Sequence, residues 1–193
     1  MFGYALKAFD FLKVQYPNSG DSLRSLLYIL PCTLAIVFCL IFALIDFNSA
    51  EGVNIFDHNA FDNISTFVQI LPGFYIGSLA AIASYNYAPM DNVMSLPAPF
   101  LREPVAEGLR ESKLSRRRYL TLLFGYLSAI SILSAVFIFI VRLVYSVNIF
   151  AVSAVIYNSV YYVVALIFFF VFWQMIMVTL FGIYYLADRM HRP

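Results

Sequence analysis

The sequence predicts an all-α integral membrane protein with four transmembrane helices and a short amphipathic helix ahead of them. Of its 193 residues, 62% are hydrophobic and 12% are charged, whereas soluble domains are about half apolar and about a quarter charged. The apolar residues gather in four runs, at roughly 25–46, 64–85, 119–147 and 151–187. Because about 20 apolar residues cross the hydrocarbon core, each run is long enough to span a bilayer. This pattern excludes a soluble globular enzyme, a disulfide-rich secreted domain and a disordered chain.

A short amphipathic helix is expected at residues 1–20, followed by the four-span membrane domain at residues 21–193. The apolar residues of the first segment recur at helical spacing: Phe2, Leu6, Phe9, Leu12 and Tyr16. Lys7, Asp10 and Lys13 fall between them. Two placements fit this pattern equally well. The helix lies in the cytoplasmic interface with its lysines facing anionic headgroups, or it docks on the cytoplasmic side of the protein itself.

The basic residues indicate how the four helices are oriented. Eleven of the twelve lie before span one, between spans two and three, or after span four, and Arg142 is the exception. The loop at 47–63 holds Glu51, Asp57 and Asp62 and no Lys or Arg. Since cytoplasmic loops carry the excess of Lys and Arg, both termini and the loop at 86–118 are expected in the cytoplasm. A bacterial inner membrane is the expected location.

The third and fourth spans are longer than a bilayer requires. As one helix, residues 151–187 would reach about 55 Å, against about 30 Å of hydrocarbon. One end of span four is therefore expected to project into water, or the helix is expected to break near Asn158 and Ser159.

Span two contains a stripe of small residues, because Gly73, Gly77 and Ala81 follow one another at intervals of four. Small residues let two helix backbones approach closely, and such packing drives helix association in lipid. The stripe packs either against another helix of the same chain or against a second copy. We expect a homo-oligomer in which span two contributes a close helix contact.

The loop at 86–118 is expected to have two halves. The first half is extended, because Pro89, Pro97 and Pro99 exclude a long helix. The second half, from 103 to 118, is predicted to be a helix with Pro104 in its first turn.

Six apolar residues of this loop belong to no span: Met90, Val93, Met94, Leu96, Phe100 and Leu101. Apolar side chains on the aqueous side cost free energy unless something covers them. Either the ends of the protein's own helices bury them, or a cytosolic protein does. Methionine and phenylalanine are typical of adaptable binding surfaces, and Arg102 and Arg110 would supply a polar rim. The hypothesis is that a cytosolic protein partner docks on these eight residues.

The sequence offers no residues for catalysis, for a metal or for a cofactor. It has no G-x-S-x-G motif, no Gly-rich phosphate loop and no cluster of Cys and His. The central part of each span carries no charge, which disfavours a proton-coupled or cation-coupled transporter. Asp46 and Arg142 lie near the outer ends of their spans, where they either pair or reach water separately. The basic residues at 116–118 are expected at lipid headgroups, and no direct binding of nucleic acid is expected.

Two functional hypotheses follow from this pattern. The first is a non-enzymatic membrane scaffold or sensor subunit that oligomerises and recruits a cytosolic partner. The second is a small pore of the holin kind, formed by oligomerisation. Leakage of liposomes that contain the purified protein alone would favour the pore.

In its architecture the chain resembles the membrane subunit of the Kiwa anti-phage defence system. The resemblance rests on four spans, a length of 193 residues, a mid-chain cytoplasmic loop and the lack of a catalytic motif. The resemblance covers the whole chain but includes no signature motif, so it assigns no functional residue. It implies an oligomer that recruits a cytosolic, DNA-binding partner, with membrane disturbance during phage attack as the trigger.

Reporter fusions test the orientation of the four spans. A reporter joined at Gly52 is expected outside the cytoplasm and one joined at Gly108 inside it, because the basic residues lie on the side of Gly108. Activity of a periplasmic and a cytoplasmic reporter at each site measures this. Two fusions that report the same compartment would overturn the four-span arrangement.

Overall fold

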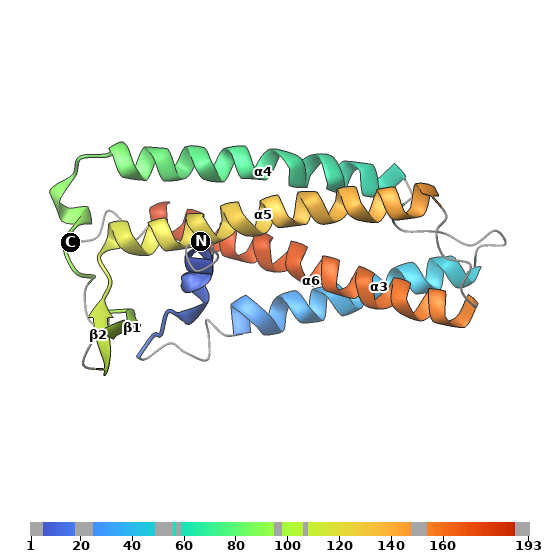
Figure 1. Ribbon diagram of the computed structural model, residues 1–193, viewed down its shortest axis with the longest axis horizontal. Helices are drawn as coiled ribbons and strands as arrows, with labels where there is room; N and C mark the ends of the chain where they lie inside the picture. Colours follow the sequence, from blue (N-terminus) through green and yellow to red (C-terminus); the bar gives the residue numbers. More distant parts are fainter. Residues whose placement is uncertain are drawn as a thin grey trace. The chain divides into compact units, whose positions relative to one another are not determined.

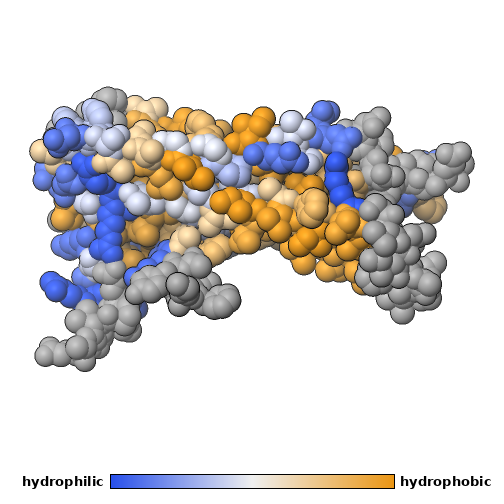
Figure 2. All heavy atoms as spheres, turned by 45° about the horizontal axis from the view of Figure 1, so that its top comes forward, coloured by the Kyte–Doolittle hydropathy of each residue, from blue (hydrophilic) through white to orange (hydrophobic). Residues whose placement is uncertain are grey.

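The computed structural model describes residues 6–17, 25–48, 56, 59–94, 98–105, 108–147 and 154–187. Four helices in this part of the chain are long and apolar enough to cross a membrane: Ser25–Asn48, Phe61–Ser84, Arg116–Val144 and Val160–Ala187 (Figure 1). On the face that Figure 2 shows, hydrophobic side chains follow the helices along much of their length, and hydrophilic ones gather toward the helix ends. The predicted number of apolar, membrane-length helices is confirmed.

The structure orders its elements as η1 (Leu6–Lys13), η2 (Ser25–Ile29), α3 (Leu30–Asn48), α4 (Asn59–Ser84), η3 (Ala88–Met90), β1 (Phe100–Val105), β2 (Gly108–Lys113), α5 (Arg116–Val147) and α6 (Ala154–Ala187). Elements η1 and η3 are 3-10 helices, and η2 is a π-helical turn. Helix α6 continues through Asn158 and Ser159, so the expected break at that point is wrong.

A β-hairpin occupies most of the segment for which a helix over 103–118 is predicted. That helix prediction is wrong, and the hairpin is a local exception in a mostly helical protein. Strands β1 and β2 pair antiparallel, with Leu101 opposite Ser112 and Arg102 opposite Glu111. Helix α5 begins only after the hairpin.

The residues of the hairpin explain why a strand forms there. Pro104 has no N–H for a helical hydrogen bond, and Gly108 loses more conformational entropy in a helix than other residues. Leu101 is buried at 4% exposure while its neighbour Arg102 is exposed. This alternation of inward and outward side chains has the period of two that a strand requires.

The chain divides into two compact units that differ in charge. The basic unit comprises Met1–Ser25, Pro72–Ala129 and Val178–Pro193, and its sequence holds eleven basic and seven acidic residues, a net charge of +4. The acidic unit comprises Leu26–Leu71 and Ile130–Met177, and it holds one basic and four acidic residues, a net charge of −3. The two units therefore carry the same charge asymmetry from which the membrane orientation is predicted.

In the basic unit, the N-terminal segment packs on α5 and β1. Phe11 is 3% exposed and stacks on Tyr126 with ring centroids 5.6 Å apart. The hydroxyls of Tyr16 and Tyr119 share a hydrogen bond of 2.7 Å. Gln15 forms a backbone bridge with the first residue of β1. Aromatic packing and backbone hydrogen bonds thus join the N-terminal segment to the rest of the basic unit.

In the acidic unit, aromatic side chains hold α3 against α6. The ring centroid of Phe38 lies 5.6 Å from that of Phe169 and 5.3 Å from that of Trp173. Aromatic pairs at such distances contribute about 0.5–1.5 kcal/mol beyond the area they bury. They give α3 a specific partner.

Asp46 and Arg142 of the acidic unit do not form the direct ion pair that is one of the two arrangements expected for them. Arg142 forms its ion pair with Asp62 of α4. Asp46 instead accepts a hydrogen bond of 2.9 Å from the hydroxyl of Tyr162. A direct pair between Asp46 and Arg142 is therefore wrong, although each has a polar partner.

The π-helical turn η2 has a cause in Pro31, two residues beyond its end. Pro31 has no N–H to donate to the carbonyl of Leu27, four residues earlier, as an α-helix would require. The Nε2 atom of Gln174 donates to that carbonyl at 3.2 Å, and Gln174 is itself 5% exposed. An unpaired carbonyl in hydrocarbon costs several kcal/mol. Gln174 therefore stabilises the start of α3.

The replacement Gln174→Leu removes this donor and leaves the Leu27 carbonyl unpaired. We expect it to lower the free energy of unfolding in detergent micelles by about 1 kcal/mol or more. In a Pro31→Ala background, the restored N–H can donate to the same carbonyl. The decrease in the free energy of unfolding should then be smaller. An equal loss in both backgrounds would show that Gln174 does not compensate for Pro31.

Candidate partner-docking site

Three of the apolar residues predicted to bind a partner lie inside the basic unit. Met90, Met94 and Leu101 are 2%, 8% and 4% exposed. The backbone N–H of Met94 donates to the carbonyl of Leu114 at 3.2 Å, which fixes this stretch beside the end of the hairpin. The prediction that these three side chains contact a partner is wrong, because the protein covers them itself.

The other predicted contact residues have different surroundings. Val93 is 56% exposed, Arg102 and Arg110 are exposed, and Phe100 is half-buried. Leu96 lies outside the described residues. The accessible part of the predicted surface is therefore mainly charged rather than apolar.

The exposed face of the hairpin carries charges of both signs. A nitrogen of Arg102 lies 3.2 Å from a carboxylate oxygen of Glu111, and the guanidinium lies 5.9 Å from the ring centroid of Phe100. These two charged side chains are 52% and 57% exposed. Lys113 is exposed on the same face, and Arg110 is exposed on the opposite face of β2. Exposed ion pairs contribute little to stability, so these residues remain available for contact with another molecule.

Backbone hydrogen bonds brace the hairpin on both sides. On the side of β1, Gln15 and Phe100 exchange two bonds of 2.9 and 3.0 Å. On the side of β2, Val93 bridges to Ser115 just before α5. A two-stranded hairpin alone is marginally stable in water. These extra contacts hold its charged face in one position on the basic unit.

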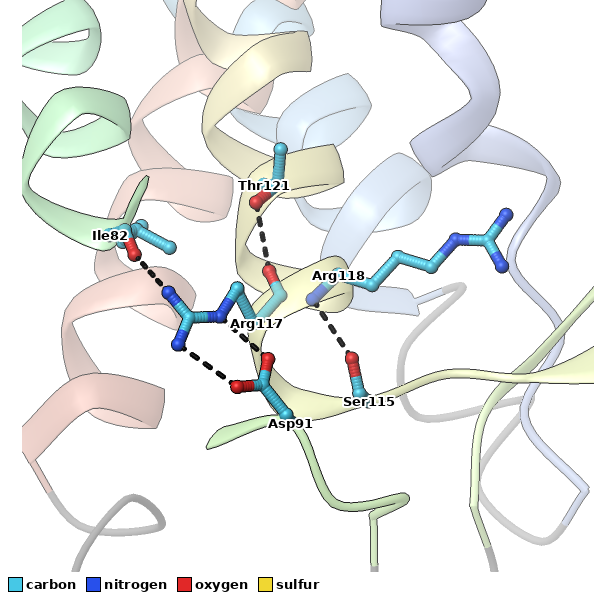
Figure 3. A network of polar contacts seen from close by, with 6 residues as sticks. All are labelled: Ile82, Asp91, Ser115, Arg117, Arg118 and Thr121. Atoms are coloured by element: carbon cyan, nitrogen blue, oxygen red, sulfur yellow. Dashed lines mark hydrogen bonds and ion pairs between the residues drawn. The ribbon is translucent and has the colours of Figure 1, made fainter. Parts of the chain in front are cut away.

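Arg117 joins the start of α5 to two other elements (Figure 3). Its Nε and Nη2 atoms donate to the two carboxylate oxygens of Asp91 at 2.7 and 3.2 Å, and its Nη1 donates to the carbonyl of Ile82 at 2.9 Å. Ile82 lies in the last turn of α4, where carbonyls lack a helical partner. The hydrogen bonds from Arg117 hold the pKa of Asp91 below its usual value. One guanidinium thus fixes the end of α4 and the turn that precedes the hairpin.

Arg118 has a separate role in the same turn of α5. Its side chain points away from the Arg117 network in Figure 3, and its Nη1 donates to the hydroxyl of Ser112 on β2 at 3.1 Å. Its backbone N–H donates to the Ser115 hydroxyl, which caps the helix, at 3.3 Å. Contact with lipid headgroups is the role predicted for the basic residues at 116–118. Arg117 and Arg118 also form these structural hydrogen bonds within the protein.

The small-residue stripe of α4 is exposed among the residues that the structure describes. Gly73, Gly77 and Ala81 are exposed, and a Cβ atom built on either glycine would meet nothing within 4 Å. Both alternatives, contact with another helix of the chain and contact with a second copy, therefore stay predictions. A close helix contact occurs instead at Gly182, where a Cβ atom would lie 3.0 Å from a methyl carbon of Leu123. No spacing pattern in the sequence marks this lone glycine.

The described part of the chain holds no group of three or more His, Cys, Asp or Glu residues placed to bind a metal ion. No protein-family model, curated protein or solved structure matches the chain. The candidate site therefore rests on the geometry of the hairpin and its supports.

Proposed function

We propose that this chain is a non-enzymatic scaffold or sensor subunit of a bacterial inner membrane, with both termini in the cytoplasm. One observation carries the proposal. The segment between the second and third apolar helices is a hairpin with an exposed charged face, braced by backbone bonds to Gln15 and Val93. A connection between two helices needs only a few residues. A braced, charged surface of this kind supports docking of a cytosolic protein.

The chemistry of the face indicates how such a partner is recognised. Arg102, Glu111 and Lys113 lie on one face of the two strands, so the partner must offer charges of both signs in register. Charges arranged this way contribute specificity and association rate more than affinity. Val93, at 56% exposure, adds one apolar contact at the edge. We therefore assign the docking surface to the hairpin rather than to the apolar residues of the loop.

The resemblance to the Kiwa membrane subunit supplies the kind of partner. Under this proposal the partner is a cytosolic protein that binds DNA, and disturbance of the membrane during phage attack is the trigger. The membrane chain then acts as the anchor that brings this partner to the bilayer.

A homo-oligomer through α4 is the second part of the proposal. Gln69, Gly73, Gly77 and Ala81 follow one another at intervals of four, and all four are exposed. The amide of Gln69 donates to the hydroxyl of Ser65 at 3.1 Å, within its own helix. An exposed amide on an apolar span favours a hydrogen bond to a neighbouring helix. Two copies inserted in the same orientation would bring their small residues and their amides together.

Exchange of one ion pair tests partner docking. The double variant Arg102→Glu/Glu111→Arg keeps the pair and the net charge but moves each charge to the other strand. We expect a soluble protein that co-purifies with the native chain from host membranes to lose at least tenfold of its binding. Quantitative mass spectrometry of the purified complexes measures this.

Met94→Ala is the matched control for that experiment. Since Met94 is buried, its truncation should lower the stability of the chain without altering the docking face. Retention of the partner by the exchange variant at native affinity would place docking elsewhere. Leakage of liposomes by the native protein alone would favour the pore instead.

Gly77→Leu tests the oligomer. Because no described residue lies within 4 Å of a Cβ atom built at this position, we expect the variant to keep the native stability of the single chain but to lose self-association. The mass of the protein–detergent complex by light scattering measures this. Ala83→Leu, at an exposed position of α4 off the stripe, should keep the native mass. A native chain that is monomeric, or two variants with equal masses, would contradict the proposal.

A further inference from the structure

The depth at which the N-terminal segment lies follows from its contacts with α5. Three consecutive arginines begin α5 at 116–118, and charged side chains of this kind are too costly to place in hydrocarbon. The ring centroid of Phe9 lies 5.9 Å from that of Tyr126, and Phe11 stacks on the same ring. Tyr126 is eight residues beyond Arg118, about 12 Å along the helix axis. The segment therefore lies beside α5, on the membrane side of its arginines.

Tyrosines mark the same level as a membrane interface. Tyr119 contacts Tyr185 of α6 with ring centroids 5.2 Å apart, and Tyr16 contacts Tyr119 at 6.3 Å. Tyrosine is enriched where headgroups meet hydrocarbon, because its ring is apolar and its hydroxyl is polar. The segment at 6–17 thus packs within the tyrosine belt at this end of α5 and α6.

The segment turns a different face away from α5. Lys7, Leu12 and Lys13 are exposed, and Leu12 is 38% exposed. The ammonium of Lys13 lies 2.7 Å from a carboxylate oxygen of Asp10, but the lysine side chain is 69% exposed. An exposed pair of this kind contributes about 0–1 kcal/mol, so it does not withhold the lysine from a phosphate. An exposed leucine between two lysines suits contact with lipid better than contact with water.

A third lysine lies near the end of the segment at Gln15 through the backbone bridges. Gln15 pairs with Phe100, and Phe100 lies opposite the exposed Lys113 of β2. Strands lie about 4.8 Å apart, so the backbone of Lys113 is about 10 Å from that of Gln15. Lys7 and Lys13 are thus exposed on the segment itself, and Lys113 is exposed on the hairpin strand that lies next to β1 beside the end of the segment.

From this arrangement we propose that residues 6–17, with Lys113, form a binding surface for acidic phospholipid headgroups. The positive charges complement the phosphates, and the depth places them where headgroups lie. In the orientation of the proposed function, these lipids belong to the inner leaflet. This surface shares Lys113 with the charged face of the hairpin, but the Arg102–Glu111 pair of that face lies farther along the strands.

Lipid retention by the full chain tests the surface. The protein is extracted from mixed vesicles of phosphatidylglycerol and phosphatidylcholine, and native mass spectrometry counts the lipids that remain bound. We expect phosphatidylglycerol to be enriched over the vesicle composition, and Lys7→Gln/Lys13→Gln to reduce this enrichment about 30-fold, at about 1 kcal/mol for each lysine. Arg102→Gln/Arg110→Gln removes the same charge from the hairpin and should leave the enrichment unchanged.

A second readout reports depth without relying on charge. In a Cys32→Ser/Cys39→Ser background, a spin label at Leu12→Cys should be more accessible to oxygen than to a water-soluble nickel complex. A label at Glu111→Cys should show the reverse. Enrichment that survives the lysine variant, an equal loss in the hairpin control, or a water-exposed label at position 12 would each overturn the proposal. Loss of the soluble partner in the exchange variant is a separate result, so the two proposals fail independently.

Discussion

A polar group that enters hydrocarbon needs a hydrogen-bond partner within the protein, and the rest of this structure depends on how that requirement is met. The carbonyl of Leu27, which Pro31 leaves without its helical donor, receives one from Gln174 on α6. Ser128 and Ser134 return their hydroxyls to carbonyls of their own helix at 2.8 Å each. Among the described residues, the buried Nε1 atom of Trp173 is an exception that has no partner. Gln174, Ser128 and Ser134 inside the spans therefore donate their hydrogen bonds to the backbone.

The same requirement shapes the boundary between the spans and the aqueous segment. Arg117 gives the last turn of α4 a donor through the Ile82 carbonyl and holds Asp91 with its other nitrogens. Beyond Asp91, backbone hydrogen bonds join the chain to the residues just before α5. These bonds position the hairpin, which lies between the two joined stretches. A bond made to complete one helix thereby positions the surface that we propose binds a partner. The N-terminal segment closes the other side through Gln15.

The apolar runs allow the four helices to be predicted, because a span leaves a signal of about 20 residues in composition alone. The hairpin leaves a weaker signal in the sequence. Its strands have six residues each, and a segment with Pro104 and Gly108 fits the start of a charged helix equally well. Burial is harder still to predict. Met90 and Val93 lie in the same loop and both have hydrophobic side chains, yet Met90 is 2% exposed and Val93 is 56% exposed. That difference arises from contacts between segments far apart in the chain, which no local pattern encodes.

Site-specific photo-crosslinking in the living host tests the central claim most directly. A photoreactive amino acid is placed at Glu111 on the hairpin and, as a control, at Leu44 of α3, which is 63% exposed on an apolar span. The account predicts a covalent adduct between position 111 and a soluble cytosolic protein, and no such adduct at position 44. Position 111 without a soluble adduct, or the same adduct from both positions, would contradict a docking role for the hairpin.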